Sequence, residues 1–212
     1  MSSTKFYCIK KVAVIGDFGV GKTSLIHALT EREFMKDPES TIGASFTQLA
    51  ITRRDLIMMN RLNYETSEEM LEDFFREYGP MRQIQIWDTA GAEQYRSIIP
   101  IYLRTASLVI ICFEASNEHA ASEVLTWTNV CNENGIENEN IILVATKEDL
   151  VDRRTGGVYL MPDIMTSAKT GSGIEMLKTT IIYRAIRDVD LGNNPKSVLD
   201  NEILIQDKKK CC

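Results

Sequence analysis

The chain has 212 residues, of which 44% are hydrophobic and 25% are charged, so one globular domain with a full core is expected. Its net charge of -6 argues against nucleic-acid binding, which usually requires a basic face. We find no apolar run of the ~18 residues that a membrane span needs, and no apolar stretch beside Lys5 and Lys10 that predicts a signal peptide. The single cysteines Cys8, Cys112 and Cys131 are typical of reduced, buried cytosolic thiols.

The predicted elements alternate between strands and helices. Residues 7–15 predict a strand that stops at Gly16, and residues 23–33 predict a helix with Leu25, Ile26 and Leu29 on one face. Further strands are predicted at 45–52, 83–87, 108–113 and 141–145, and further helices at 120–131 and 174–189. The last two strands are continuous apolar runs, as in parallel strands buried on both faces. This order predicts an α/β domain with a mainly parallel sheet.

Residues 16–23 read GDFGVGKT and match the phosphate-loop pattern G-x-x-x-x-G-K-[ST], with a strand before it and a helix after it. Backbone N–H groups of such a loop point at phosphate oxygens, Lys22 reaches the outer phosphates and Thr23 offers its hydroxyl to Mg²⁺. The alternative is a chance glycine-rich turn. The loop alone does not identify the base or the reaction, because kinases and ATPases share it.

Three more motifs follow in order. Thr41 opens TIGASF, Asp88 opens DTAG within WDTAG, and the segments 146–149 and 166–169 read TKED and TSAK. Together with the loop they resemble the Ras superfamily of small GTPases, and TIGASF with WDTAG most resembles the Rab branch. The resemblance covers residues 6–190 and the tail. It implies the P-loop small GTPase fold, a six-stranded, mostly parallel sheet flanked by helices, and binding of GTP and GDP with Mg²⁺.

The TKED segment distinguishes guanine from adenine. Asp149 can accept hydrogen bonds from the N1–H and 2-amino groups of guanine, which adenine cannot donate, while Lys147 can lay its stem along the ring and the Ala168 N–H can reach O6. Thr146 stands where the family usually has Asn, which leaves the nucleotide affinity open. Phe34 falls at the family position of an aromatic packed against guanine, although it could also be an ordinary core residue.

The resemblance also implies the remaining site residues. The full nucleotide-binding set is Gly16, Phe18, Gly19, Val20, Gly21, Lys22, Thr23, Ser24, Phe34, Thr41, Gly91, Thr146, Lys147, Asp149, Ser167, Ala168 and Lys169. Thr23, Thr41 and Asp88 would bind Mg²⁺, and Lys22, Thr41 and Gly91 would serve catalysis. The segments at Thr41 and Gly91 would become ordered by the γ-phosphate and loosen when it leaves. Phe46, Trp87 and Tyr102 fall at the three positions with which Rab proteins face effectors, although each alone could be core.

Two departures from the family bear on hydrolysis. Ala92 replaces the usual Gln, whose amide orients the attacking water. Phe18 replaces a small residue, and its ring should crowd the γ-phosphate and any arginine finger, a contribution of ~10³ to 10⁵ in rate. We therefore predict that intrinsic GTP hydrolysis is very slow. The alternative is that Gln94, or a Gln supplied by a partner, replaces the missing amide.

An insertion and a shortened connection distinguish this chain. From Thr41 to Trp87 there are 46 positions, about twice what two strands and a hairpin loop need. The insertion, about 54–81, contains a capping box at 66–69 and a predicted helix with one aromatic face and one acidic face. That aromatic face could pack on this domain or on a partner. Residues 150–166 are too few for the helix that the family places there, so a short or irregular connection is expected.

The end of the chain reads KKKCC. Rab proteins commonly end in two cysteines that receive geranylgeranyl groups, and two lipid chains beside a basic cluster give stable anchoring. Cys211 and Cys212 are thus the predicted lipidation sites, and a solvated charged terminus is the alternative. We expect a G domain at 1–190 and a flexible tail at 191–212.

The predicted function is a monomeric Rab-like GTPase that acts as a switch in vesicle traffic, in the cytoplasm and peripheral on the cytosolic face of an endomembrane. Its expected partners are an exchange factor, an activating protein, an escort or dissociation-inhibitor protein and effectors, and no nucleic acid. The rival interpretation is a GTP-locked or nucleotide-insensitive adaptor that recruits partners without cycling. A P-loop kinase would need a lid and an acceptor site, of which the sequence gives no evident sign.

Overall fold

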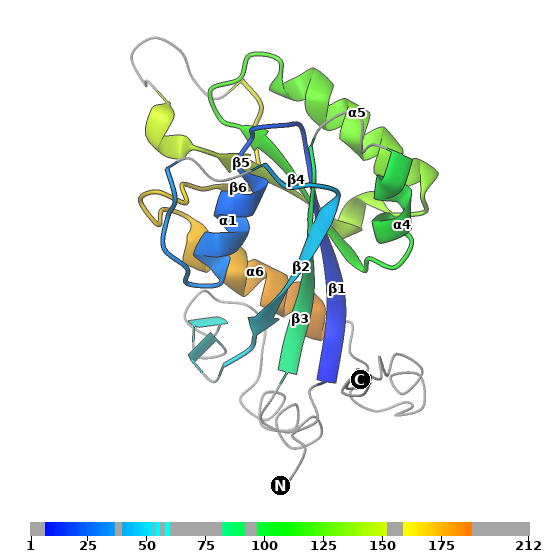
Figure 1. The fold of residues 1–212 in the computed structure, drawn as a ribbon, viewed down its shortest axis with the longest axis vertical. Helices are drawn as coiled ribbons and strands as arrows, with labels where there is room; N and C mark the ends of the chain where they lie inside the picture. Colours follow the sequence, from blue (N-terminus) through cyan, green and yellow to red (C-terminus); the bar gives the residue numbers. More distant parts are fainter. Residues whose placement is uncertain are drawn as a thin grey trace, which may run out of the picture.

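A six-stranded sheet runs through the middle of the computed structural model, with strand order β2-β3-β1-β4-β5-β6 (Figure 1). The structure describes residues 7–36, 40–52, 54–55, 58–59, 82–91, 97–151 and 159–187. The strands are β1 Tyr7–Ile15, β2 Ala44–Ala50, β3 Arg82–Thr89, β4 Leu108–Glu114, β5 Ile141–Thr146 and β6 Ile164–Met165. The β2 and β3 strands pair antiparallel and the other pairs are parallel, which confirms the predicted fold class.

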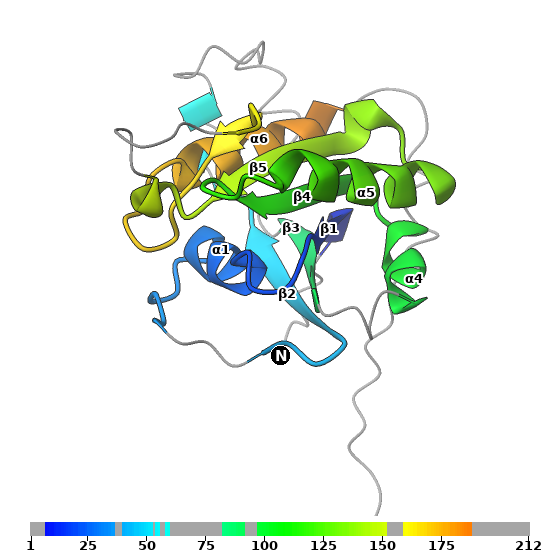
Figure 2. The ribbon, with the colours of Figure 1, turned by 90° about the horizontal axis from the view of Figure 1, so that it is seen from above.

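Helices cover both faces of the sheet (Figures 1 and 2). The α1 helix (Lys22–Leu29) and the α6 helix (Ile174–Arg187) lie on one face, and the α4 helix (Ile99–Leu103) and the α5 helix (Ala120–Glu133) lie on the other. Short 3-10 turns occur at Asn138–Asn140 and Glu148–Leu150. Alternation along β1 builds the two cores, since Val12 and Val14 join the α1 and α6 cluster while Ala13 and Ile15 join the α4 and α5 cluster.

The clearest differences from the predicted elements concern α1 and α4. The α1 helix ends at Leu29 rather than at 33, because Glu31 adopts a left-handed φ of 58°, which an α-helix cannot continue through. The chain from 32 to 36 is therefore free to run along the edge of the cavity described below. The α4 helix was not predicted, because a helix of 5 residues is too short to show a period in the sequence.

The start of the predicted insertion packs against the domain. Asp55 accepts hydrogen bonds from the backbone N–H and the hydroxyl of Thr52 at 2.7 and 2.6 Å, and it pairs with the Lys178 ammonium of α6 at 2.8 Å. Met59 is fully buried in the core that α1 and α6 share. The described part of the insertion thus touches this domain. The predicted helix that follows the capping box at 66–69, with its aromatic face, lies outside the described residues.

Several other predictions fall outside the described residues, namely Ala92, Gln94, residues 152–158 of the shortened connection, and the tail 191–212 with Cys211 and Cys212. Cys112 and Cys131 are buried free thiols, as predicted, and burial raises the pKa of each to about 12. Among the described helices, none is both long and apolar enough to cross a bilayer.

Candidate functional site

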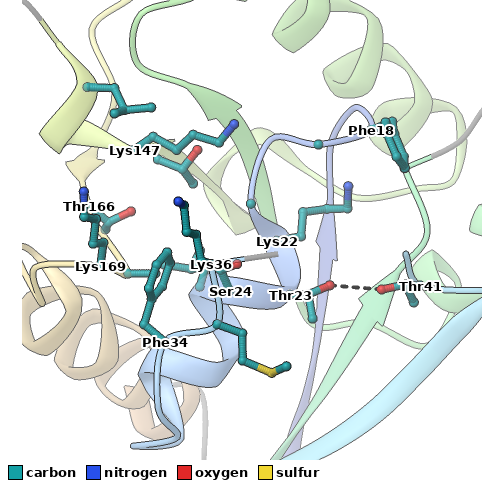
Figure 3. A pocket seen from close by; sticks show the side chains of 18 of the residues that line it. Phe18, Lys22, Thr23, Ser24, Phe34, Lys36, Thr41, Lys147, Thr166 and Lys169 are labelled. Carbon is teal, nitrogen blue, oxygen red and sulfur yellow. Dashed lines mark hydrogen bonds between the residues drawn. The ribbon is translucent and has the colours of Figure 1, made fainter. Parts of the chain in front are cut away.

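A cavity of about 720 Å³ opens at the carboxyl end of the parallel strands, beside the N-terminus of α1 (Figure 3). This volume is typical of ligand sites. It is lined by most of the predicted nucleotide-binding residues, namely Phe18, Gly19, Gly21, Lys22, Thr23, Ser24, Phe34, Thr41, Gly91, Thr146, Lys147, Asp149, Ala168 and Lys169. The predicted residues Gly16, Val20 and Ser167 are buried and do not line it. The sequence motifs therefore meet at one cavity.

The phosphate loop holds its own lysine. The Lys22 ammonium donates hydrogen bonds to the carbonyls of Gly16 at 2.9 Å and Asp17 at 2.7 Å. The residue is only 6% exposed, and burial lowers the pKa of the ammonium. Gly16 has a φ of 140°, and a Cβ at this position would collide with the Cys112 carbonyl of β4. The loop therefore needs glycine where it leaves β1.

Gly91 of the DTAG motif lies directly against this loop. A Cβ at this position would be 2.5 Å from the Asp17 carbonyl oxygen and would collide with the Lys22 ammonium. Any side chain at this position would push the segment after β3 away from the phosphate loop. The backbone of Gly91 is thus placed next to the lysine that the sequence assigns to the outer phosphates.

Three oxygen donors gather beside the lysine. The hydroxyl oxygens of Thr23 and Thr41 are 3.0 Å apart, joined by the dashed line in Figure 3, and Thr23 donates to Asp88 Oδ2 at 2.7 Å. Asp88 is 3% exposed, and its Oδ1 has no hydrogen-bond partner among the described residues. Burial raises the pKa of Asp88, and the Thr23 hydrogen bond opposes this. A buried carboxylate behind two hydroxyls is a donor set that fits Mg²⁺.

The opposite end of the cavity carries the TKED and TSAK residues. Asp149 accepts a hydrogen bond from Ser167 at 2.6 Å, and the Lys169 ammonium lies 3.7 Å from its other oxygen. Ser167 thus orients Asp149 rather than lining the cavity. Phe34 lies on the same cavity (Figure 3) and is 44% exposed, so it is not an ordinary core residue.

Thr146 connects the two ends of the cavity. Its hydroxyl lies 2.5 Å from the Val20 carbonyl in the phosphate loop and 2.9 Å from the Phe113 carbonyl in β4. The residue is 4% exposed, and its single hydroxyl proton serves these backbone acceptors. The residue at the unusual family position therefore ties β5 to the loop.

The three predicted effector-facing aromatics are in contact. The ring centroids of Phe46 on β2 and Trp87 on β3 are 5.6 Å apart, and those of Trp87 and Tyr102 on α4 are 5.2 Å apart. Phe46 is 48% exposed, and the other two are partly buried. Pairing of Phe46 with Trp87 across the β2 and β3 strands brings them together. The rings form one aromatic cluster rather than three separate core positions.

Two residues near the cavity were not singled out from the sequence. Glu114, the last residue of β4, binds the Lys147 ammonium at 2.7 Å, and Trp127 of α5 donates from its indole nitrogen to Asp17 at 2.9 Å. A signal for Glu114 existed, because polar residues at the carboxyl ends of parallel strands often face the ligand crevice. Trp127 gave no such signal, since a tryptophan on an apolar helix face predicts core packing.

Comparisons with known proteins agree with this geometry. A sequence profile of the Ras family matches residues 11–186. The chain is 30% identical to the human Ras-related protein Rab-27A, over 94% of this chain and 90% of that protein. It is 28% identical to RABF2b of Arabidopsis thaliana, over 89% and 86% of the two chains, and 28% identical to Rab-5B of Plasmodium falciparum (isolate 3D7), over 87% and 83%. The chain therefore belongs to the Ras family, within which it is a Rab-like small GTPase.

Proposed function

We propose that this protein is a guanine nucleotide switch that binds GTP and GDP with Mg²⁺ and hydrolyses GTP very slowly on its own. The observation that carries the proposal is the single cavity with the phosphate loop at one end and Asp149 at the other. Proteins of the Ras family in general bind these nucleotides with Mg²⁺. The phosphate loop, the threonines of the Mg²⁺ donor set and Asp149 share one cavity in this chain, which favours a guanine nucleotide as its ligand.

The roles of the residues follow from their positions. Lys22 and the loop N–H groups would face the phosphates, and the Gly91 N–H would meet the γ-phosphate. Mg²⁺ held by Thr23 and Thr41, with Asp88 behind them, would neutralise phosphate charge. Asp149 selects guanine because it offers only acceptors, whereas the matching edge of adenine presents no pair of donors.

Slow hydrolysis is proposed on two residues. Phe18 lines the cavity and is 66% exposed (Figure 3), and its ring would crowd a γ-phosphate or an arginine finger there. Ala92, which lies outside the described residues, has no amide to orient a water. Both substitutions act on the same chemical step. Loss of these contributions is expected to lower the rate without lowering nucleotide binding.

Single-turnover hydrolysis of bound GTP with Mg²⁺ tests this proposal. We would compare the native chain with Ala92→Gln combined with Phe18→Ser, and with Glu118→Gln as a control at an exposed position outside the cavity. The double variant is expected to hydrolyse at least about tenfold faster than the native chain and the control. Equal rates would show that another group, Gln94 first, positions the water. If the native chain bound no guanine nucleotide, the switch itself would be refuted.

The same proposal includes a membrane-traffic role. The G domain would span 1–190, with the insertion at about 54–81 and the tail at 191–212 carrying geranylgeranyl groups on Cys211 and Cys212. The Phe46, Trp87 and Tyr102 cluster would meet effectors. The protein would cycle as a monomer on the cytosolic face of an endomembrane, with its exchange factor, activating protein and escort protein.

Mass spectrometry after enzymatic prenylation tests the lipid anchor. The native chain should show two added groups, and the double variant Cys211→Ser with Cys212→Ser should show none.

A further inference from the structure

The carboxylate of Glu114 meets the lysine of the TKED motif at the cavity. Glu114 ends β4 and pairs in register with Thr146, the residue before Lys147 on the neighbouring parallel strand β5. The Lys147 ammonium lies 2.7 Å from Glu114 Oε2, and the Ser116 hydroxyl donates to Oε1 at 2.8 Å. Both oxygens of this carboxylate are therefore engaged, which fixes the direction in which it presents its charge.

Lys147 is held at both ends of its side chain. Its backbone has a left-handed φ of 56°, a conformation that is uncommon for a residue with a Cβ and that turns the chain after β5. Its ammonium is held by Glu114, and the residue lines the cavity (Figure 3). The four-carbon stem between these two fixed points is therefore set in place along the cavity wall. Long charged side chains commonly present such a stem to an apolar surface while the charge stays with a polar partner.

We infer that Glu114 is a positioning residue for guanine recognition, which acts by holding the Lys147 stem against the face of the bound base. This rests on the proposed nucleotide-binding function. A free lysine side chain loses its rotamer freedom when it binds, and the Glu114 contact removes much of that freedom beforehand. Glu114 also neutralises the ammonium, so the lysine is kept at the base instead of turning toward the phosphates.

An ordinary surface ion pair is the competing explanation. The two side chains are 34% and 31% exposed, and pairs of this kind usually contribute little to folding. The Lys147 interaction lowers the pKa of Glu114, which agrees with a formed pair under either explanation. The two explanations differ in what the pair affects. A positioning role changes nucleotide retention, whereas an ordinary surface pair does not.

The test is the release of a fluorescent GDP derivative from the full chain with Mg²⁺. We would compare the native chain with Glu114→Gln, Lys147→Met, their combination and Glu118→Gln. Glu118 is a 70% exposed carboxylate that follows Glu114 closely in the sequence. Glu114→Gln is expected to speed release by about three- to tenfold, and Glu118→Gln to leave it unchanged. In the Lys147→Met background the Glu114 change should have no further effect, because the two residues act as a unit.

Three results would overturn the inference. Glu114→Gln could match Glu118→Gln, or the effects of Glu114→Gln and Lys147→Met could multiply, which would mean that Glu114 does not act through the lysine. A native chain that binds no GDP derivative would refute the proposed function and the inference together. Glu114→Asp guards against a folding defect, because it keeps the charge but shortens the reach by one methylene. Glu114→Asp should release GDP at a rate between those of the native chain and Glu114→Gln. Its thermal unfolding midpoint should equal that of the native chain.

Discussion

The two ends of the cavity differ in how deeply the fold buries their side chains. At the phosphate end, Lys22 is 6% and Asp88 is 3% exposed, and both are hydrogen-bonded within the chain. At the base end, the side chains of Lys147 and Lys169 are 34% and 62% exposed, and Phe34 is 44% exposed. The phosphate end is thus the more deeply buried, whereas the base end is more exposed and its Lys147 and Asp149 are held by Glu114 and Ser167. Substitutions at the two ends should therefore have separable effects.

The largest separation is expected from Asp149→Asn. An amide replaces one acceptor by a donor, so it mismatches the 2-amino group of guanine but matches the 2-carbonyl of xanthine. Loss of one hydrogen bond and the two donors that then face each other should weaken GDP binding by about 100-fold or more, with the preference moved toward XDP. The preference is measured by how well GDP and XDP each displace a bound fluorescent nucleotide. The control is Asp163→Asn. The Asp163 carboxylate accepts a hydrogen bond from the Leu143 N–H and does not line the cavity. An unchanged preference would remove Asp149 from base recognition.

Asp88→Asn should act only at the phosphate end. The substitution removes the buried charge behind Thr23 and Thr41, so Mg²⁺ should retain nucleotide less well, by about tenfold or more. The measurement is the rate of GDP release as free Mg²⁺ is raised. With the metal chelated, the native and variant chains should release GDP at similar rates, and both should keep their guanine preference. A change of base preference would show that the two ends are not separable.

The phosphate end was also the easier end to predict from sequence. The GDFGVGKT segment carries its loop glycines, its lysine and its threonine within 8 residues, and short-range sterics and hydrogen bonding dictate their geometry. The continuous apolar runs likewise predicted β4 and β5, because strands buried on both faces need no alternation. Local sequence patterns were sufficient to predict an element wherever the contacts that fix its geometry are close in sequence.

Contacts between distant segments were not predictable in this way. Glu114 and Lys147 are 33 residues apart, and Asp17 and Trp127 are 110 apart, so only the strand order and helix packing bring them together. The ion pair between Asp55 and Lys178 joins two positions that are 123 apart in the sequence. The sequence leaves the effect of Thr146 on nucleotide affinity open, because Thr146 stands where the family usually has Asn. The bonds of its side chain to the Val20 and Phe113 carbonyls follow only from the fold.

Thr146→Val tests the connection between the two ends. The variant keeps the shape but removes the hydroxyl that serves the Val20 carbonyl, at a cost of about 1 to 2 kcal/mol. Thr146 supports the phosphate loop and is not proposed to contact the base or the Mg²⁺ ion. GDP release should therefore become about tenfold faster, while the base preference and the Mg²⁺ dependence stay unchanged. Thr179→Val removes a similar hydroxyl bond within α6, at a residue that does not line the cavity, and is the control. Equal release from both variants would contradict the role of Thr146.

Trp127→Phe should give the smallest effect. Phenylalanine keeps most of the apolar packing of α5 but cannot donate to Asp17, whose carbonyl also receives the Lys22 ammonium. One lost hydrogen bond of about 1 kcal/mol should speed GDP release about two- to fivefold, through the phosphate end alone. Trp87→Phe is the matched control, because its indole nitrogen has no hydrogen-bond partner among the described residues. If both variants released GDP alike, α5 would not support the phosphate loop. A change in base preference with Trp127→Phe would instead show that α5 acts on the whole cavity.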